Sequence, residues 1–244
     1  MRIAITGADG FIGRNLRVRL LELGHDDVIE LTRRTPVEAL ENALENTDFV
    51  FHMAGVNRPQ NADEFALGNT AYTERVCSSM ARAHRRATMV LASSTQAVLD
   101  NAYGRSKLAA EAAVRNYASS SGARVYVARL TNVFGKWARP NYNSAVATFC
   151  HNISRDLPIN VNDPSALLRL IYVDDVAEAL VGLLKQPQLT DEFIEVTPVY
   201  ETTVGVVART LQGFADSRST LMSPPGRNGS DTCALQHVYQ LSSN

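Results

Sequence analysis

Residues 6–13 read Thr6-Gly-Ala-Asp-Gly-Phe-Ile-Gly13, between a short apolar run at residues 2–6 and a helical pattern at residues 11–23. A strand, a glycine turn and a helix are therefore predicted in succession. Gly7 permits a tight turn, Gly10 removes the Cβ that would hold a pyrophosphate away, and Gly13 lets the helix approach the strand. The free N–H groups at the helix start would bind the anion. The predicted dinucleotide loop comprises Gly7, Asp9, Gly10, Phe11, Ile12 and Gly13.

Short apolar runs alternate with helical patterns over roughly the first half of the chain. This alternation predicts an α/β fold, a Rossmann-type doubly wound parallel sheet, whose ligand crevice lies at the carboxyl ends of the strands. The expected strands cover residues 2–6, 27–31, 48–51, 88–92 and 124–129, and the expected helices cover residues 11–23, 37–46, 64–84 and 105–120.

The remaining residues predict a smaller second part. Residues 1–131 are expected to form the nucleotide-binding core, and residues 132–215 a small C-terminal substrate-binding lobe that is interleaved with it. Residues 216–244 include a polar, Gly- and Pro-rich stretch and are expected to be a disordered or aberrant tail. Within the lobe, the expected strands cover residues 159–161 and 170–173, and the expected helices 144–154 and 175–185.

Composition limits the classes of function. The chain has 244 residues and a formal net charge of −1, whereas a nucleic-acid-binding protein normally carries a basic excess. No apolar run approaches the ~18 residues that would span a bilayer, and no signal-peptide core follows Met1, so a cytoplasmic enzyme is expected. The three cysteines show neither disulfide nor metal-ligand spacing, so no metal is expected.

The end of the second expected strand bears on cofactor choice. An NAD-specific site usually places Asp or Glu there to bind the ribose 2′-hydroxyl, but Thr32 occupies this position and is followed by Arg33 and Arg34. Either guanidinium would form charge-assisted hydrogen bonds with a 2′-phosphate, which favours NADPH. The alternative is that both arginines are solvated loop charges. Strand alternation directs Glu30 away, so we do not assign it to the ribose.

Ser94, Tyr103 and Lys107 are the candidate catalytic residues. Reduction of a ketone requires a proton at the carbonyl oxygen, and tyrosine, with an ordinary pKa near 10, is a poor acid at neutral pH. Lys107 lies one helical turn from Tyr103, where its ammonium would stabilise the phenolate and lower the pKa. Ser94 would hold the carbonyl against the tyrosine. The alternative is a packed tyrosine beside a surface lysine.

These motifs together resemble the extended short-chain dehydrogenases/reductases that act on nucleotide sugars. The matching segments are residues 6–13, Phe51-His-Met-Ala-Gly55, Tyr103-Gly-Arg-Ser-Lys107, Arg129-Leu-Thr-Asn-Val-Phe-Gly135 and Tyr172-Val-Asp-Asp-Val-Ala177. A narrower resemblance is to the CapF/WbjC enzymes of capsule and O-antigen synthesis, on the route to UDP-N-acetyl-L-fucosamine. It rests above all on Phe134-Gly-Lys-Trp-Ala-Arg-Pro-Asn-Tyr-Asn-Ser144 and runs from residue 1 to about 222.

The resemblance implies a reaction and a set of site residues. It implies NADPH-dependent reduction of the 4-keto group of a UDP-2-acetamido-2,6-dideoxy-hexos-4-ulose to the UDP-2-acetamido-2,6-dideoxy-L-talose product. The UDP-linked 4-keto-6-deoxy amino sugar is thus the expected partner, and a homodimer is possible. Besides the residues already named, the implied cofactor contacts are His52, Ala54, Gly55, Asn69 and Asn132, and the implied substrate contacts are Ser94, Thr95, Phe134, Asn141, Asn143 and Arg169. Turn formation beside Pro140 is an equal alternative for the two asparagines Asn141 and Asn143.

Competing activities leave different patterns. A 4,6-dehydratase needs an acidic pair after the active-site hydroxyl residue, but Ser94 is followed by Thr95-Gln96-Ala97. A 4-epimerase would keep NAD bound through both half-reactions, which the two arginines after Thr32 disfavour. A non-catalytic, NADPH-binding regulatory protein would have an eroded catalytic set. Reduction is favoured, and the sugar configuration, the nucleotide and the oligomeric state stay open.

The end of the sequence departs from the resemblance. CapF/WbjC enzymes continue into a metal-binding cupin domain that acts before reduction, and this chain has none of it. A one-base shift in a back-translation of Cys233-Ala-Leu-Gln-His-Val-Tyr239 yields Ala-Leu-Tyr-Ser-Thr-Tyr, a run typical of the family. A frameshift between about Met222 and Cys233, leaving a reductase-only chain with a poorly packed tail, is therefore our hypothesis.

Overall fold

The computed structural model of the protein describes residues 1–61, 63–83, 86–185, 192–220 and 235–236. The chain forms two compact units. The first comprises residues 1–131 and 176–196, and the second comprises residues 132–175 and the chain from residue 197 onward. Each unit is described by itself.

The first unit is built on a six-stranded sheet in which every neighbouring pair is parallel. The strand order is β2-β1-β3-β4-β5-β8, which confirms the predicted doubly wound sheet. In this order the connections change direction between β1 and β3, so the ligand crevice is expected beyond the carboxyl ends of these two strands. The strands are β1 (Ile3–Thr6), β2 (Val28–Leu31), β3 (Phe49–His52), β4 (Thr88–Ser94), β5 (Val125–Leu130) and β8 (Phe193–Ile194).

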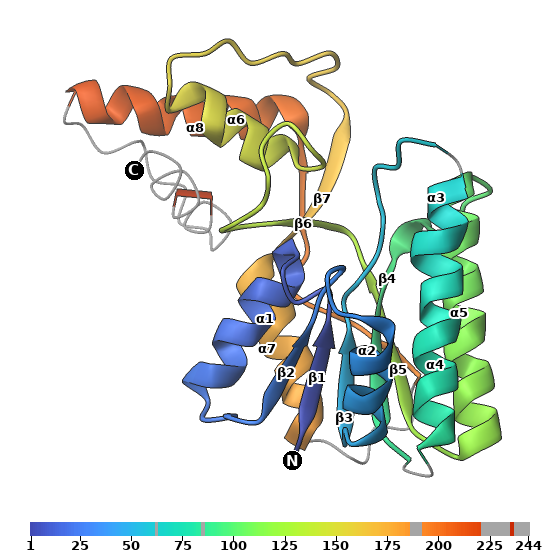
Figure 1. The fold of residues 1–244 in the computed structure, drawn as a ribbon. Coiled ribbons are helices and arrows are strands. Elements are labelled where there is room, and N and C mark those ends of the chain that lie inside the picture. Colours follow the sequence, from blue (N-terminus) through green and yellow to red (C-terminus); the bar gives the residue numbers. More distant parts are fainter. Residues whose placement is uncertain (62, 84–85, 186–191, 221–234, 237–244) are drawn as a thin grey trace. The chain divides into compact units, whose positions relative to one another are not determined.

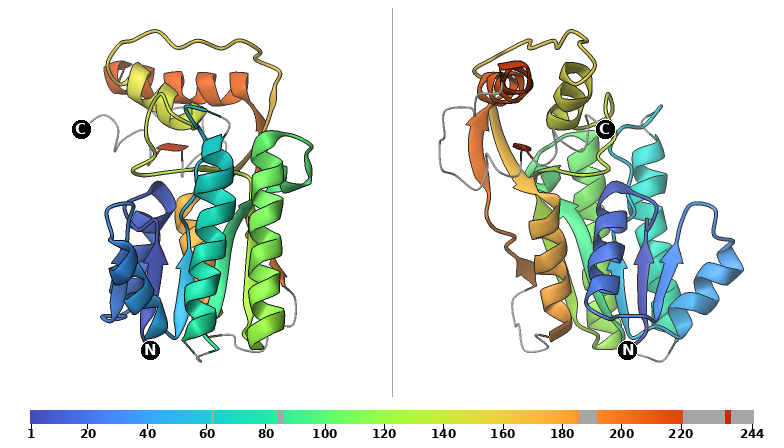
Figure 2. Two further views of the ribbon diagram at one scale, coloured as in Figure 1. Left: turned by 45° about the vertical axis from the view of Figure 1, so that its right-hand side comes forward. Right: turned by 90° about the vertical axis from the view of Figure 1, so that its left-hand side faces the viewer.

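Helices cover both faces of this sheet. Figures 1 and 2 show α2, α4 and α5 on one face and α1 with α7 on the other. An ion pair of 2.6 Å between Arg19 Nε and Glu178 Oε2 joins α1 to α7. The helices are α1 (Phe11–Glu22), α2 (Val37–Glu45), α3 (Asp63–Phe65), the π-helical η1 (Ala66–Ala71), α4 (Tyr72–Arg82), the 3₁₀ turn η2 (Thr95–Val98), α5 (Ala102–Ser121), α7 (Val173–Gly182) and the 3₁₀ turn η3 (Leu183–Lys185).

The apolar core of the first unit explains why the strands form. All four residues of β1 and all four of β3 are buried, as expected for a parallel sheet that is covered on both faces. On the face of α2, α4 and α5, alternate strand residues meet the apolar sides of these helices. That cluster includes Ala4, Val50, Met89, Leu91, Leu40, Leu44, Val76, Met80, Ala110 and Val114.

The second unit has its own small sheet and core. Strand β6 (Asn132–Phe134) pairs in parallel with β7 (Leu167–Tyr172), which pairs antiparallel with β9 (Tyr200–Thr203). Helices α6 (Ala145–Ile153) and α8 (Val204–Thr220) accompany this sheet (Figure 1). The core consists of Phe134, Val146, Phe149, Cys150, Ile153, Leu170, Val207, Ala208, Leu211, Phe214 and Leu235.

Several expected boundaries were wrong. Residues 159–161 form no strand, because Ile159 and Val161 are instead half-buried side chains packed against the core of the second unit. Residues 216–220, expected in the tail, continue α8, and Leu235 is buried in the same core. The remaining tail, residues 221–234 and 237–244, lies outside the described residues. The predicted helix at residues 64–84 contains the π-helical segment η1.

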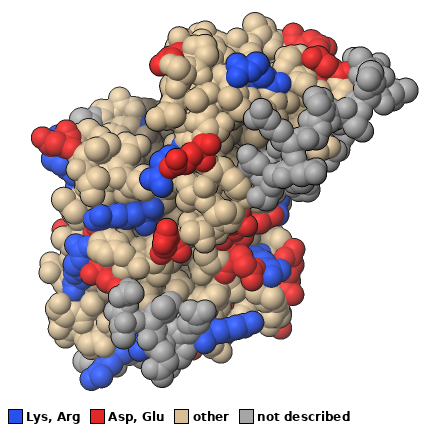
Figure 3. Space-filling view, turned by 180° about the vertical axis from the view of Figure 1, so that it is seen from behind, with Lys and Arg blue, Asp and Glu red and all other residues tan. Residues whose placement is uncertain are grey.

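Two further features concern the charges on the surface and the length and hydropathy of the helices. On the face drawn in Figure 3, basic and acidic side chains are interspersed rather than gathered by sign. Within the described ranges, none of the helices is both long and apolar enough to cross a membrane.

The start of α5 packs tightly against η2. Asn101 caps the helix by accepting a 2.7 Å hydrogen bond from the backbone N–H of Gly104. A Cβ on Gly104 would lie 2.4 Å from the carbonyl oxygens of both Gln96 and Leu99, so only glycine allows this approach. The contact holds the first turn of α5 against the end of β4 and the residues that follow it.

We expect Gly104→Ala to lower the free energy of unfolding by about 1–3 kcal/mol, because the backbone of α5 or η2 must shift. Gly182→Ala is the matched control, since a Cβ there meets nothing within 4 Å, and we expect no loss of stability. Thermal unfolding of both variants measures the difference. Equal melting temperatures for the two variants would contradict the tight packing described here.

Candidate active site

The turn after β1 lies at the predicted crevice. Gly7 has a φ of +68°, and a Cβ there would lie 2.8 Å from the backbone N and Cα of Ala54, in the loop after β3. The loops that follow β1 and β3 therefore touch backbone to backbone. A side chain at residue 7 would fill the space between the two strand ends.

The start of α1 offers unpaired N–H groups. Gly10 precedes the helix in an extended conformation, and among the described residues no side chain caps the first turn. The N–H of Gly10 donates a 2.9 Å hydrogen bond to the carbonyl oxygen of Gly7, and a Cβ on Gly13 would lie 2.2 Å from that same oxygen. Helix and turn are thus in direct contact. Such a helix start is suited to an anion such as a pyrophosphate.

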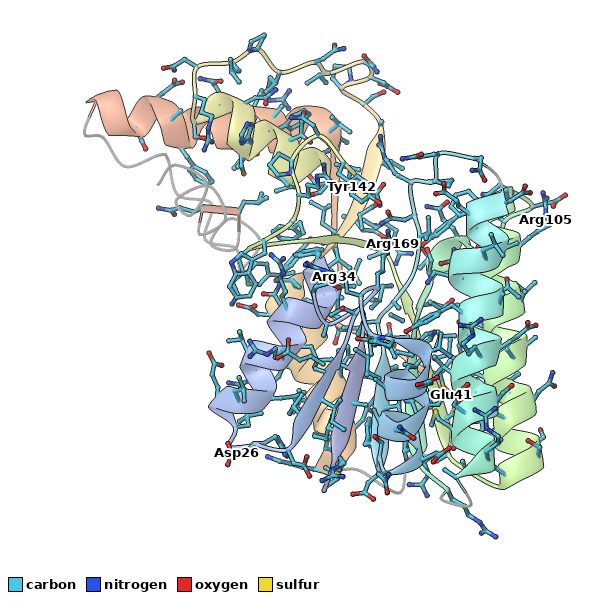
Figure 4. All side chains as sticks on the ribbon, in the orientation of Figure 1. Asp26, Arg34, Glu41, Arg105, Tyr142 and Arg169 are labelled. Carbon is cyan, nitrogen blue, oxygen red and sulfur yellow. The ribbon has the colours of Figure 1, made fainter. Side chains whose placement is uncertain are left out.

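The loop after β2 presents two arginines. Thr32 and Thr35 brace it, because Thr35 Oγ1 accepts a 2.9 Å bond from the N–H of Thr32, and Thr32 Oγ1 accepts a 3.2 Å bond from the N–H of Arg34. Arg33 and Arg34 are exposed, and neither forms an ion pair within the described part of the chain. Figure 4 shows Arg34 in this loop.

Glu30, the carboxylate nearest this loop, forms an ion pair with Arg17 of α1. Its charge is therefore already balanced. This pairing agrees with leaving Glu30 out of the predicted cofactor contacts.

His52 lies at the centre of a buried hydrogen-bond chain. Thr73 Oγ1 donates to the carbonyl oxygen of Asn69 at 2.6 Å, so it accepts the 2.8 Å bond from His52 Nε2–H. The unprotonated Nδ1 then accepts from Thr6 Oγ1 at 2.6 Å, and Thr6 in turn accepts from the N–H of Ala54. Burial, together with the positive charge of Lys107, lowers the pKa of His52 to about 3. The neutral imidazole thus ties β1 to β3 and α4.

Asn69 holds the loop after β3 rather than presenting a free amide. Its Oδ1 accepts from the N–H of Val56 at 2.7 Å, and its Nδ2 donates to the carbonyl oxygen of Val56 and to Ser106 Oγ, each at 2.9 Å. Ser106 Oγ donates to the carbonyl oxygen of Tyr103 at 2.7 Å. The side chain of Asn69 therefore links this loop to α5. Its role toward a cofactor stays a prediction.

The side chains of Ser94 and Tyr103 lie close enough for the Ser94 hydroxyl to lower the pKa of the phenol by hydrogen bonding. Ser94 is the last residue of β4 and is buried, while Tyr103 is half-buried in the first turn of α5, with the ring of Phe65 5.6 Å away. Burial raises the pKa of Tyr103, and the bond to Ser94 opposes this rise. The sequence argument expected a lowered pKa. That expectation was wrong for this chain, because the loss of hydration is the larger effect.

Lys107 is buried in the same unit, one helical turn after Tyr103 on α5. Its side chain is 6 % exposed, and Nζ donates a 2.9 Å hydrogen bond to the carbonyl oxygen of Ala92 in β4. A Cβ on Gly55 would lie 3.1 Å from Nζ, so this glycine leaves room for the ammonium. Burial lowers the pKa of Lys107 to about 8, and the charge of Glu111 opposes this effect. The alternative of a surface lysine is therefore excluded.

Glu111 is a buried carboxylate that the sequence argument missed. It is fully buried and accepts hydrogen bonds from Ser93 Oγ at 2.6 Å and from Arg129 at 2.9 and 2.7 Å. Burial alone would raise its pKa, but the bonds from Arg129 and Ser93 hold the pKa below its ordinary value. Its position, one helical turn after Lys107, was the available signal in the sequence.

The remaining predicted residues, the cofactor contact Asn132 and the substrate contacts, occupy varied surroundings. Thr95 in the first unit is exposed, as are Asn132, Asn141 and Asn143 in the second. Phe134 is a core residue whose ring lies 5.4 Å from that of Tyr172. Arg169 forms a 3.2 Å ion pair with Glu201, and Asn141 has the left-handed backbone of a turn residue. The first unit thus brings the predicted catalytic and loop residues together, and the roles of the second set stay predictions.

The described residues were also searched for side chains that could bind a metal ion together. They contain no group of three or more His, Cys, Asp or Glu side chains that could hold a metal ion. Cys77 and Cys150 are both buried, and burial raises the pKa of each thiol to about 12.

The chain is similar in sequence to a known family and to known proteins. Residues 3–196 match the model of the NAD dependent epimerase/dehydratase family. The chain is 43 % identical over 240 residues to a UDP-2-acetamido-2,6-beta-L-arabino-hexul-4-ose reductase of Pseudomonas aeruginosa, covering 98 % of this chain and 64 % of that protein.

Two solved structures are similar as well. The capsular polysaccharide assembling protein CapF from Staphylococcus aureus superimposes with a TM-score of 0.89 at 37 % identity, covering 99 % of this chain and 65 % of that one. CapF with the inhibitor 3-isopropenyl-tropolone gives a TM-score of 0.82 at 33 % identity, covering 100 % of this chain and 63 % of that one. The chain thus spans about two thirds of the length of these relatives.

The depressed pKa of Lys107 predicts a pH-dependent stability. The unfolded chain, with an ordinary lysine pKa of 10.5, binds more protons than the fold between pH about 8 and 10.5, so stability rises with pH through this window. We expect Lys107→Met to raise the melting temperature near pH 7, and the gain to shrink as pH rises through the window. Lys185→Met, at an exposed lysine, is the control. A gain for Lys107→Met that is the same at both ends of the window would contradict the assigned burial cost.

Proposed function

The chain belongs to the NAD dependent epimerase/dehydratase family, and we propose that it is an NADPH-dependent 4-ketoreductase of a nucleotide sugar. The proposed substrate is a UDP-2-acetamido-2,6-dideoxy-hexos-4-ulose, and the product is the corresponding UDP-2-acetamido-2,6-dideoxy-L-talose. The observation that carries the proposal is the 43 % identity, over nearly the whole chain, to a protein named as a reductase of such a 4-keto sugar. The arrangement of Ser94, Tyr103 and Lys107 supports it independently.

The residues of the first unit fit a dinucleotide. The turn at Gly7 has no space for a Cβ, and the start of α1 has unpaired N–H groups suited to a pyrophosphate. The exposed guanidinium groups of Arg33 and Arg34 suit a 2′-phosphate, which favours NADPH over NADH. When bound, this cofactor supplies the hydride that reaches the carbonyl carbon.

Tyr103 is the proposed proton donor. Its phenolic proton moves from Oη to the carbonyl oxygen of the substrate as the hydride reaches the carbon, so that an alcohol forms. The phenol is protonated at neutral pH, but burial raises its pKa and so makes Tyr103 a weaker acid, which means that transfer of the proton needs a neighbouring cation to stabilise the phenolate. The Ser94 hydroxyl, which lies close to this phenol, would hold the carbonyl oxygen beside it.

Lys107 would stabilise the phenolate that remains. Its ammonium is buried and is directed by the carbonyl oxygen of Ala92, so its charge acts where water screens it little. Glu111, one turn further along α5, favours the protonated form of the lysine, and Arg129 balances the charge of Glu111. Lys107, Glu111 and Arg129 thus alternate in charge from α5 to β5.

The proposal predicts net oxidation of NADPH by a UDP-linked 4-keto-6-deoxy amino sugar, followed as the loss of NADPH absorbance. Tyr103→Phe should lose turnover by about two to four orders of magnitude while NADPH binding is kept, because the ring still packs but the proton source is gone. Interconversion of two sugar nucleotides without net oxidation of cofactor would instead identify a 4-epimerase. Near wild-type turnover by Tyr103→Phe would remove the tyrosine from its assigned role.

Cofactor preference provides a separate test. We expect NADPH to bind at least about tenfold more tightly than NADH, since one charge-assisted hydrogen bond contributes about 1.5–3 kcal/mol. The double variant Arg33→Ala with Arg34→Ala should lose most of this preference and bind NADH almost as the wild type does. Isothermal titration calorimetry with both cofactors measures this. Equal affinities in the wild-type protein would refute the preference.

A further inference from the structure

The end of β4 is bound to α5 by two side chains of the helix. Lys107 Nζ donates a 2.9 Å hydrogen bond to the carbonyl oxygen of Ala92, and Glu111 Oε1 accepts a 2.6 Å bond from Ser93 Oγ. Glu111 follows Lys107 by one helical turn, so both side chains lie on the same side of the helix. The next and last residue of β4 is Ser94, the candidate catalytic serine. Strand and helix are therefore joined directly beside the candidate site.

Glu111 also binds the neighbouring strand β5. Arg129 donates from Nε to Oε1 at 2.9 Å and from Nη2 to Oε2 at 2.7 Å, a bidentate contact that fixes the plane of the carboxylate. Arg129 and Ser93 are register partners in the paired strands β5 and β4, which explains why both side chains reach one carboxylate. Glu111 is fully buried, so these bonds replace the water that it has lost.

The network continues to the edge of the sheet through Arg115. Arg115 Nη2 lies 3.5 Å from Glu111 Oε2, and its Nε lies 2.6 Å from Glu192 Oε1, next to β8. The guanidinium carbons of Arg129 and Arg115 lie 4.5 and 5.4 Å from the centre of the Phe193 ring. The side chain of Glu192 is 33 % exposed, whereas that of Glu111 is wholly buried. The two carboxylates of the network thus differ sharply in their access to water.

The charged and titratable groups around Lys107 explain why the buried carboxylate matters to it. On the same helix lie the phenol of Tyr103 and the carboxylate of Glu111. Strand β3 contributes His52, whose imidazole is neutral, and β5 contributes Arg129 on the far side of the carboxylate. Of these groups, Glu111 alone is negative. An ion pair with Arg129 would already satisfy the carboxylate, whereas the ammonium has no other counter-charge in this set.

We propose that Glu111 is a positioning residue for the reduction and acts through two neighbours. Through Ser93 it fixes the end of β4, and so holds the Ser94 hydroxyl in place. Through its charge it keeps Lys107 protonated, which preserves the cation that the phenolate of Tyr103 needs. Because Glu111 is fully buried, it has no contact with the substrate in this role. The inference rests on the proposed function, which assigns the serine, the tyrosine and the lysine to the reaction.

The chain has only three lysines, which makes the charge effect measurable without turnover. In protein that carries isotope-labelled lysine, the NMR shift of the Lys107 Cε reports its protonation as pH is varied, and Lys136 and Lys185 are internal references. Glu111→Gln keeps the shape but not the charge, so the pH of half-titration of Lys107 should fall by about one unit, a tenfold loss of proton affinity. Arg129→Gln removes a positive charge and should shift it upward.

Opposite shifts distinguish charge from packing. An interior that was merely loosened would admit water and raise the pH of half-titration in both variants, so shifts of the same sign would overturn the proposal. Glu192→Gln, at the partly exposed carboxylate, is the matched control and should leave the titration of Lys107 unchanged. An equal effect of Glu192→Gln and Glu111→Gln would also count against it. Should Glu111→Gln fail to fold, an unmoved titration in Arg129→Gln alone rules out the charge effect.

Turnover separates the positional effect from the charge effect. Ser93→Ala removes only one bond to the carboxylate, so kcat should fall about tenfold, by the same factor at every pH. Glu111→Gln should instead lose turnover increasingly as pH rises, because Lys107 then releases its proton at a lower pH. The KM and the affinity for NADPH should change little in either variant. An unchanged kcat in Ser93→Ala would refute the positional effect, and a wild-type pH profile in Glu111→Gln would refute the charge effect.

This proposal and the ketoreductase fail in different ways. The lysine titration requires neither cofactor nor sugar nucleotide, so opposite shifts in a chain that oxidises no NADPH would refute only the ketoreductase. Reduction of the 4-keto sugar at the wild-type rate by Glu111→Gln, with the titration of Lys107 unmoved, would refute only the positioning role.

Discussion

A buried ammonium group, that of Lys107, is the constraint on which the first unit depends. Taking a cation out of water is costly, and the surrounding elements each contribute something that offsets the cost. Strand β4 offers the carbonyl oxygen of Ala92, α5 places Glu111 one turn away, and Gly55 leaves the space that the ammonium occupies. Arg129 of β5 in turn neutralises Glu111. An interior arranged for stability alone would not contain this lysine, so its presence points to chemistry.

The sequence predicted most of the first unit because its signals there are local. Apolar runs of four to seven residues marked β1 to β5, and the glycines of residues 7–13 marked the turn that the crevice requires. Strands β6 and β8 were missed because three and two residues carry too few alternations to detect, and β9 was missed because its sequence Tyr-Glu-Thr-Thr is not an apolar run. The false strand at residues 159–161 had the opposite origin: its apolar residues pack as isolated side chains.

The sequence predicted which residues belong to the candidate site. It did not predict the hydrogen bonds and electrostatic effects that connect them. Spacing along a helix predicted that Tyr103 and Lys107 share a face, whereas burial, which decides the direction of a pKa, depends on segments distant in the sequence. Asn69 illustrates the same limit. Its amide is engaged by Val56 and Ser106, two partners that no local pattern reveals. Phe134 was predicted to contact the substrate, but its side chain is buried in the core of the second unit.

The π-helical segment at residues 66–71 limits which single-residue deletions this part of the chain can tolerate. A π turn contains one more residue than an α turn for each hydrogen bond, so it behaves as a single-residue insertion in an otherwise regular helix. Loss of that residue would rotate everything before it by about 100° relative to α4. Phe65, beside Tyr103, and Thr73, beside His52, could then no longer both keep their partners. Homologous chains that keep both contacts should therefore share this extra residue.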